Sequence, residues 1–472
     1  MTTPIRTLNL RDRILGLDEQ VPLLDGRRVP YVNLDNAAST PPMQDVMDEL
    51  SRFMPFYSSV HRGTGFKSRL STEVYERAHA TIAEFVGADL STNCVIFGKN
   101  TTEAINKLSY RIPISDDAVV ITTMMEHHSN DLPWRGRAEV VHVAVTPEGR
   151  LDEDDFDRQL DKYAGRIALV AVSGASNVTG FIQPIHELAR KTHDHGTMIL
   201  IDAAQLAPRR KVDMKPDGDP EHLDFVAISA HKMYAPFGTG ALIGPDEVFL
   251  SAPPEYRGGG TVDVVTADEV EWAGTPDRDE AGSPNVIGAL AMAVAAQVLM
   301  EVGMDQVAAH EQELVEYTLE RLGAMKGITV YGETDPARAG EKVGVIPFNL
   351  NGVSQSLVAA ILGYEAGVGV RSGCFCAQPY VVHLLTLTDE VSPMWREQML
   401  GGDRSSMPGM VRMSFGCYNN IEDIDRMMEM LERIAANDYQ GEYQLEIASG
   451  EYLPVDYEEP ILDFLPLGMH ST

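Results

Sequence analysis

The strongest constraint on this chain is a series of short apolar runs, rich in β-branched residues, between residues 118 and 229. Each run is continuous rather than alternating with polar residues, which is typical of strands covered on both faces of a parallel sheet. Polar amphipathic stretches, such as 154–162 and 184–195, separate the runs and predict helices. The five runs are 118–123, 139–144, 166–172, 198–202 and 225–229. This alternation predicts a doubly wound α/β domain.

The order of apolar runs and amphipathic stretches changes after Met300, where a smaller α+β domain is predicted to begin. An apolar run at 286–300 is shorter than the roughly 18 residues of a membrane span and predicts a buried helix. Helices are also expected at 306–326, from 355 and at 421–435, and strands at 327–330 and 343–350. The predicted segments are an arm at 1–30, part of the small domain at 31–74, the large domain at 75–300, the small domain at 301–440 and an acidic tail at 441–472.

The charge of the chain excludes several kinds of partner. Lysine and arginine number 38 and aspartate and glutamate 70, so the net charge is 38 − 70 = −32. Such a surface repels nucleic acids and anionic membranes, so neither is expected as a partner. Solubility explains the excess of acid, with a basic protein partner as the alternative. The N-terminus resembles no secretory signal and four cysteines are too few for a disulfide framework, so we expect a cytoplasmic protein.

Polar residues stand where the predicted strands end, which is where open α/β sheets bind ligands. Taken singly, each has an ordinary explanation as a loop carboxylate or a surface lysine. Together they supply a lysine for a Schiff base, a carboxylate for a pyridine nitrogen, an aromatic ring for stacking and a helix start for a phosphate, which are the requirements of pyridoxal phosphate. The residues are Thr101, His127, Asp202 and Lys232. His127 and His128 lack the spacing of a zinc-binding helix, so no metal is predicted.

Over residues 30–435 the sequence resembles the class V, fold-type I pyridoxal-phosphate enzymes, and within them the cysteine desulfurases and selenocysteine lyases. The lysine and aspartate blocks, Ser229-Ala-His-Lys and Asp202-Ala-Ala-Gln, carry the superfamily resemblance, and Arg371-Ser-Gly-Cys-Phe-Cys-Ala-Gln-Pro narrows it. Further matching blocks begin at Tyr31, Ser59, Thr101, Glu126 and Ala281. The resemblance implies a large domain with a mostly parallel, seven-stranded type of sheet, a smaller α+β domain and a homodimer, with 31–74 contributing to the active site and the dimer contact.

The resemblance also implies roles for individual residues. Lys232 would hold the cofactor as a Schiff base and act as a base, and Asp202 would pair with the pyridinium. His127 would stack on the ring and act in catalysis as a proton carrier. The other implied cofactor contacts are Thr101, Thr102, Asn177, Gln205, Ser229, His231 and, from the other subunit, Ser283. The implied substrate contacts are Ala38, Asn177, Arg371 and Arg412, the last binding the carboxylate as a fork.

Cys376 decides which reaction is expected. It lies in a glycine-rich loop near Arg371, a cation that favours a reactive thiolate, and the family places its nucleophilic cysteine there. We therefore expect a cysteine desulfurase that converts L-cysteine to L-alanine and leaves a persulfide on Cys376, for a possible sulfur-acceptor protein. Cys374 is expected to be the poorer nucleophile, and Cys94 and Cys417 to be structural.

Alternatives to that reaction remain open at this point. They are another class V reaction (a C–S lyase, selenocysteine lyase, epimerase or aminotransferase) and a non-catalytic scaffold. The insertion at 381–409 and the tail depart from the family pattern and leave the amino-acid substrate open.

Overall fold

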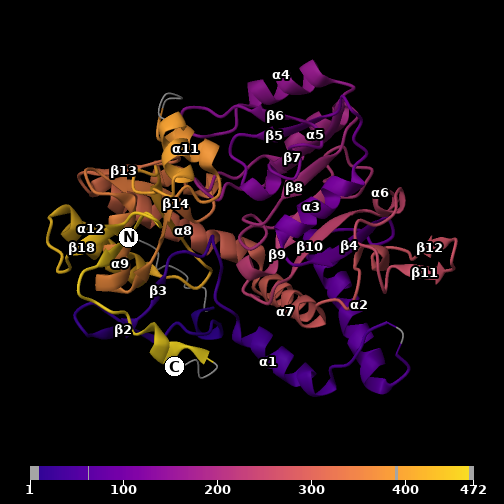
Figure 1. Cartoon of the computed structure of the whole chain (residues 1–472), viewed down its shortest axis with the longest axis horizontal. Helices are drawn as coiled ribbons and strands as arrows, with labels where there is room; N and C mark the ends of the chain where they lie inside the picture. The colour runs from indigo at the N-terminus through magenta and orange to yellow at the C-terminus, as the bar shows by residue number, and fades with distance from the viewer. Residues whose placement is uncertain (1–9, 62, 388–391, 467–472) are drawn as a thin grey trace.

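The structure is a computed structural model that describes residues 10–61, 63–387 and 392–466. Its main element is a seven-stranded sheet in the order β4-β10-β9-β8-β7-β5-β6, shown in purple and pink in Figure 1. The strands are β4 (Asn93–Gly98), β5 (Val119–Thr123), β6 (Glu139–Val143), β7 (Ile167–Ser173), β8 (Ile199–Asp202), β9 (Phe225–Ser229) and β10 (Gly240–Pro245). The five predicted strands and the mostly parallel α/β sheet are confirmed; β10 runs antiparallel to both of its neighbours.

Helices cover both faces of this sheet because successive strand residues point to opposite sides. Val119 and Ile121 enter one apolar core, while Val120 between them enters another. The helices of this part are α2 (Phe66–Val86), α3 (Thr101–Arg111), α4 (Glu153–Tyr163), α5 (Ile185–Asp194), α6 (Asp246–Leu250) and α7 (Val286–Val302). The predicted apolar helix at 286–300 is α7, which packs against α2 and α1 (Gln44–Phe53).

A smaller sheet with its own apolar core follows α7, on the left in Figure 1. Its order is β13-β14-β17-β16, with β13 (Ile328–Val330), β14 (Val345–Leu350), β16 (Arg371–Gly373) and β17 (Met410–Ser414). Helices α8 (Met304–Ala324), α9 (Gln355–Ala366) and α12 (Ile421–Ala435) match the three expected here. Strand β15 (Val368–Gly369) pairs with β3 (Val32–Asn33), so the N-terminal segment joins this unit.

The N-terminal arm and the C-terminal tail both lie against the smaller unit. Strands β1 (Gln20–Pro22) and β2 (Arg28–Pro30) form one hairpin, and β18 (Tyr443–Glu446) and β19 (Glu451–Pro454) form another. Glu365 of α9 accepts hydrogen bonds from the backbone N–H groups of Gln440 and Gly441, so the tail is laid over α9. Short 3₁₀ turns lie at Arg11–Arg13, Met54–Phe56, His128–Asn130, Ala230–Lys232, Asp277–Asp279, Pro336–Glu341 and Ile461–Phe464.

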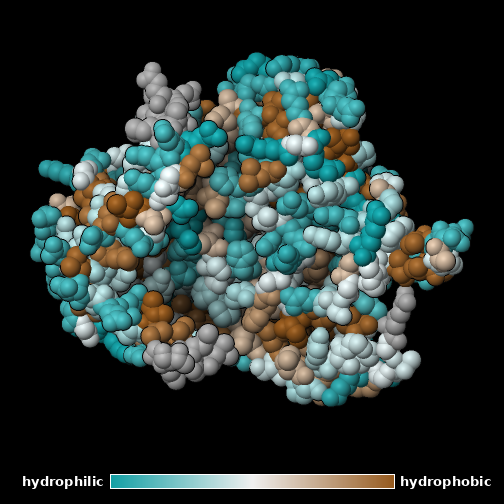
Figure 2. Space-filling model, viewed as in Figure 1, coloured by the Kyte–Doolittle hydropathy of each residue, from teal (hydrophilic) through white to brown (hydrophobic). Residues whose placement is uncertain are grey.

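Two further segments extend from the main body. The hairpin β11 (Val262–Val265) and β12 (Val270–Trp272) projects at the right of Figures 1 and 2 and exposes apolar side chains. Helix α10 (Gln378–Leu384) leads into the 381–409 insertion, which contains α11 (Ser392–Leu400), and Tyr380 of α10 donates to the carbonyl oxygen of Gly149. In the described part of the chain no single helix is long and apolar enough to cross a membrane; α7 and α8 reach that length only together, across a bend of 79°.

Candidate active site

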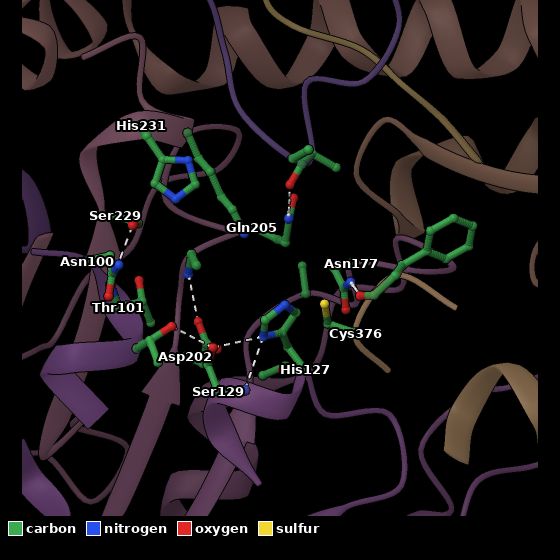
Figure 3. A pocket seen from close by; sticks show the side chains of 18 of the residues that line it. Asn100, Thr101, His127, Ser129, Asn177, Asp202, Gln205, Ser229, His231 and Cys376 are labelled. Carbon is green, nitrogen blue, oxygen red and sulfur yellow. Dashed lines mark hydrogen bonds between the residues drawn. The ribbon is translucent and has the colours of Figure 1, made fainter. Parts of the chain in front are cut away.

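A cavity of about 250 Å³ lies where the carboxyl ends of β4, β5, β7, β8 and β9 meet the smaller unit (Figure 3). Loops after strands that run the same way gather at one edge of the sheet, which explains why residues distant in sequence meet there. Thirteen of the predicted site residues line this cavity: Ala38, Thr101, Thr102, His127, Asn177, Asp202, Gln205, Ser229, His231, Lys232, Arg371, Cys376 and Arg412.

Ser283 is the predicted residue that the chain does not bring to the cavity. It is exposed just before α7. Its expected contribution across a dimer stays a prediction, because the structure contains a single chain.

The N-terminus of α3 forms one wall and is suited to an anion. Asn100 caps the helix by accepting from the N–H of Glu103, and the N–H of Thr101 donates to Oγ of Ser229 at 3.4 Å, so a second hydroxyl lies against this helix end. The hydroxyl of Thr101 is buried and has no hydrogen-bond partner among the described residues. Gly240 permits this approach, because a Cβ there would lie 2.6 Å from the Cα of Asn100.

Lys232 and Asp202 are the charged pair at the floor of the cavity. Burial is the main cause that lowers the pKa of Lys232 to about 8, and the positive charges of Arg412 and Arg209 add to it, while Asp202 opposes them. Burial raises the pKa of Asp202, against a hydrogen bond from the N–H of Ala204. The site therefore holds an amine that is easily deprotonated and a carboxylate that gains from a positive partner.

His127 presents a neutral imidazole to the cavity. Burial, then the charge of Lys232, lowers the pKa of His127 to about 3. The backbone N–H of Ser129 donates to its Nδ1 at 3.1 Å, so the neutral ring carries its proton on Nε2. Similarly, burial and Lys232 lower the pKa of His231 to about 4. Both imidazole rings are therefore neutral and lie near the charge of Lys232, so either ring can pack against an aromatic ligand without adding a second positive charge.

The loop that carries Cys376 is held against the large sheet by two hydrogen bonds. Asn177 donates from Nδ2 to the carbonyl oxygen of Phe375 at 2.7 Å. The backbone N–H of His128 donates to the carbonyl oxygen of Cys376 at 2.8 Å. Phe375 and Cys376 have φ angles of 53° and 55°, a left-handed conformation that residues other than glycine rarely adopt. The turn places the sulfur of Cys376 at the cavity beside Asn177 and His127 (Figure 3).

The four cysteines differ sharply in exposure. Cys376 is exposed, whereas Cys94, Cys374 and Cys417 are buried. Cys374 donates to the carbonyl oxygen of Pro408, and burial raises its pKa to about 11. Burial likewise raises the pKa of Cys417 to about 12 and that of Cys94 far above its ordinary value. Cys376 is therefore the thiol best able to react with a bound molecule.

Arg412 is a buried cation whose partners are only partly protein groups. Its Nη1 donates to the carbonyl oxygen of Asn177 at 3.0 Å, and its Nη2 pairs with Asp35 at 2.8 Å. Arg371 pairs with the other carboxylate oxygen of Asp35, also at 2.8 Å. The Nε of Arg412 is buried without a hydrogen-bond partner among the described residues. This arrangement leaves a donor and a net positive charge for a substrate carboxylate.

Sequence reasoning missed several residues of the site. Asp35 neutralises part of the arginine pair, and Glu126, the residue before His127, is buried and accepts from Ser173. Asp35 and Glu126 stand outside the cavity lining, and the lining residues that were not predicted are Ala37, Asn100, Ser129, Ser173, Ala175, Ala204 and Phe375. Asp35 stands inside a block that matches the family, Tyr31 to Ser39, so position in that block was the available signal. No described residue of the 381–409 insertion lines the cavity.

Comparison with known proteins identifies the family. The family model for class-V aminotransferases matches residues 32–427. A cysteine desulfurase from Haloferax volcanii is 34% identical over 86% of this chain and 90% of its own length. A probable cysteine desulfurase from Halalkalibacterium halodurans is 33% identical over 86% of this chain and 93% of its own length.

A solved structure of a cysteine desulfurase has the same fold as this chain. The apo structure of a cysteine desulfurase from Thermococcus onnurineus superposes with a TM-score of 0.77 and 28% identity, covering 93% of this chain and 99% of the other. The expected fold-type I architecture and the family resemblance are thereby confirmed. The chain belongs to the class-V aminotransferase family of pyridoxal-phosphate enzymes and, within it, to the cysteine desulfurases.

Proposed function

We propose that this enzyme is a pyridoxal-phosphate-dependent cysteine desulfurase that converts L-cysteine to L-alanine and receives the sulfur on Cys376. One observation carries the proposal. The only exposed thiol among the four cysteines shares a cavity with an easily deprotonated lysine, a buried carboxylate and a buried arginine. The 34% identical desulfurase from Haloferax volcanii supports it further.

The residues of the cavity fit pyridoxal phosphate. The unpartnered hydroxyl of Thr101, the N-terminus of α3 and Ser229 suit its phosphate. The raised pKa of Asp202 means that a positive partner stabilises its ionised form, as a pyridinium nitrogen would. Gln205, whose Nε2 donates to the carbonyl oxygen of Ala37 at 2.7 Å, keeps a second amide proton for the ring hydroxyl.

When bound, pyridoxal phosphate supplies the electron sink that makes the Cα proton of an amino acid removable at neutral pH. Lys232, with its lowered pKa, holds the cofactor and then takes and returns a proton as a base. Arg412 binds the substrate carboxylate with its free donor capacity, and Asn177 holds both the arginine and the cysteine loop in place.

The sulfur transfer balances without an added oxidant or reductant. The Cys376 thiolate attacks the sulfur of the substrate, so one S–S bond forms as the substrate Cβ–S bond breaks. The electron pair of that bond passes to the carbon skeleton, which takes up a proton at Cβ and leaves as alanine. The enzyme keeps one extra sulfur as a persulfide, and a sulfur-acceptor protein regenerates the thiol.

Replacing the thiol tests the proposal. The Cys376→Ser variant, incubated with L-cysteine, should gain no sulfur in an intact-mass measurement and should form alanine at least about 100-fold more slowly, since the nucleophile is lost. The matched control is Cys374→Ala, which should keep both the added sulfur and the rate, because Cys374 is buried. Equal alanine formation by the Cys376→Ser variant and the parent would refute the proposed role.

We also propose a homodimer in the cytoplasm. The exposed Val264 and Val265 of the projecting β11–β12 hairpin offer apolar surface for a second copy, and Ser283 would then reach the partner's cavity. A free reactive thiol is best preserved in a reducing compartment. Analytical ultracentrifugation tests the dimer, which should sediment at twice the mass of the chain. The Ser283→Ala variant tests the shared site, because it should bind the cofactor more weakly than the parent does.

A further inference from the structure

Two histidines and one aspartate lie close together at the edge of the large sheet that is opposite the active site. His193 lies at the end of α5, His222 in the loop before β9, and Asp224 immediately before that strand. Asp202 and Ser229, by contrast, stand at the carboxyl ends of β8 and β9 and line the cavity. One ligand atom from each member of the cluster lies within 4.8 Å of the others.

The hydrogen bonds of the two rings fix where their protons lie. His193 donates from Nδ1 to the carbonyl oxygen of Pro220 at 2.8 Å, and His222 from Nδ1 to that of Asp219 at 2.7 Å. A carbonyl oxygen only accepts, so each Nδ1 carries a proton. In a neutral imidazole the lone pair must then be on Nε2. This arrangement, Nδ1–H bonded to a backbone carbonyl, is typical of histidines that bind a metal through Nε2.

Both Nε2 atoms face the same carboxylate. The Nε2 of His193 lies 2.9 Å from Oδ2 of Asp224, and the Nε2 of His222 lies 3.3 Å from Oδ1. With neutral rings, lone pairs would face a carboxylate that is itself rich in lone pairs. If both rings were protonated, two cations would be stacked, because the rings are 4.2 Å apart and only 18° from parallel. A single proton on Nε2 of His193 would serve the shorter contact but leave the lone pair of His222 facing Oδ1, whereas a shared cation would serve both rings and the carboxylate.

We propose that His193, His222 and Asp224 form a structural binding site for a divalent transition metal, with zinc as the best candidate. Two imidazoles and one carboxylate are ligands that zinc prefers. Tetrahedral bonds of about 2.0–2.1 Å separate neighbouring ligand atoms by about 3.3 Å. The His222 contact of 3.3 Å has this length, and the His193 contact of 2.9 Å would lengthen by a few tenths of an ångström when a metal enters. The side chains are 17%, 21% and 10% exposed, so a water molecule completes the fourth position from the open side.

The site would join three elements that no disulfide links. Asp224 also accepts from the backbone N–H of Ile199 through Oδ2 at 2.8 Å, which orients the carboxylate and extends the link to β8. The metal would thus connect α5, the loop before β9 and the start of β8, on the side of the sheet away from the chemistry. Its expected effect is on stability rather than on the turnover of cysteine.

The test is equilibrium dialysis of the purified, cofactor-loaded enzyme against zinc at about pH 8, with metal content measured by mass spectrometry. The His193→Gln variant should bind one zinc equivalent fewer than the parent enzyme, and zinc should raise the unfolding temperature of the parent but not of the variant. The difference in content removes any zinc bound by the active-site thiol, which both proteins share. The His222→Gln variant serves where His193→Gln does not fold.

His195→Gln is the matched control. His195 also donates from Nδ1 to a carbonyl oxygen, that of Lys191, and its Nε2 faces Asp161 at 3.1 Å, but no second imidazole from the described residues joins it. This variant should keep the full zinc content. Equal zinc in the parent, His193→Gln and His222→Gln enzymes would overturn the proposal and leave a proton-sharing histidine pair, whatever the outcome for cysteine desulfurization.

Discussion

The amine of Lys232 should become reactive about 2.5 pH units below an ordinary lysine. Its pKa is lowered from 10.5 to about 8, mainly because burial disfavours the charged form. A shift of that size corresponds to about 3 kcal/mol against protonation. At pH 7.5 roughly a quarter of the amine is then neutral, against about one in a thousand for a solvent-exposed lysine.

The assay follows cofactor capture by enzyme from which pyridoxal phosphate has been removed. The neutral amine is the nucleophile, so the observed rate should rise with pH and level off above a midpoint near 8, as monitored by the absorbance of the bound cofactor. A Lys232→Arg variant should show no such change and serves as the blank. A midpoint near 10 would refute the reasoning, because it would mean that burial does not penalise the charge.

Three further changes probe the surroundings of the site. Gly240→Ala should destabilise the protein by about 1–3 kcal/mol and weaken cofactor binding, because the new Cβ would lie 2.6 Å from the backbone of Asn100. Urea unfolding measures the stability, and titration followed by absorbance measures the cofactor affinity. Unchanged values would contradict the close approach of these two backbone segments. Asp35→Asn should cost about 3–5 kcal/mol of stability by leaving Arg412 short of its counter-charge, and a melting temperature equal to the parent's would argue against that pairing. Burial raises the pKa of Glu126 from 4.5 to about 7, so between these pH values the folded state binds more protons than the unfolded state. The stability that this carboxyl contributes is therefore complete below pH 4.5 and falls by about 3 kcal/mol as the pH rises through 7. The Glu126→Gln variant should lack that part of the pH dependence in urea unfolding at pH 5 and 8, and a slope like the parent's would assign it to other groups.

The strands around the cavity were predictable because their signal is local. Runs such as 198–202 and 225–229 are apolar and continuous, and a strand buried on both faces requires that pattern at each position. Strand β10 was missed, because Gly240-Ala-Leu-Ile-Gly-Pro has glycine at both ends of its apolar core and little β-branched character. Its antiparallel pairing with β9 and β4 depends on the partners that flank it, which no local pattern encodes.

The amino-acid sequence by itself determined the doubly wound class, the family and most of the residues that meet at the cavity, since these depend on periodicity and on residue types in short blocks. Folding alone decided which of two neighbouring thiols is exposed: Cys374 and Cys376 differ because a left-handed turn directs one into a core and the other into the cavity. Folding likewise brought Asp35 between two arginines more than 300 positions away, and His193 against His222 and Asp224. Charge, exposure and pKa depend on the distance to every neighbour in space, and spacing along the chain does not contain that distance.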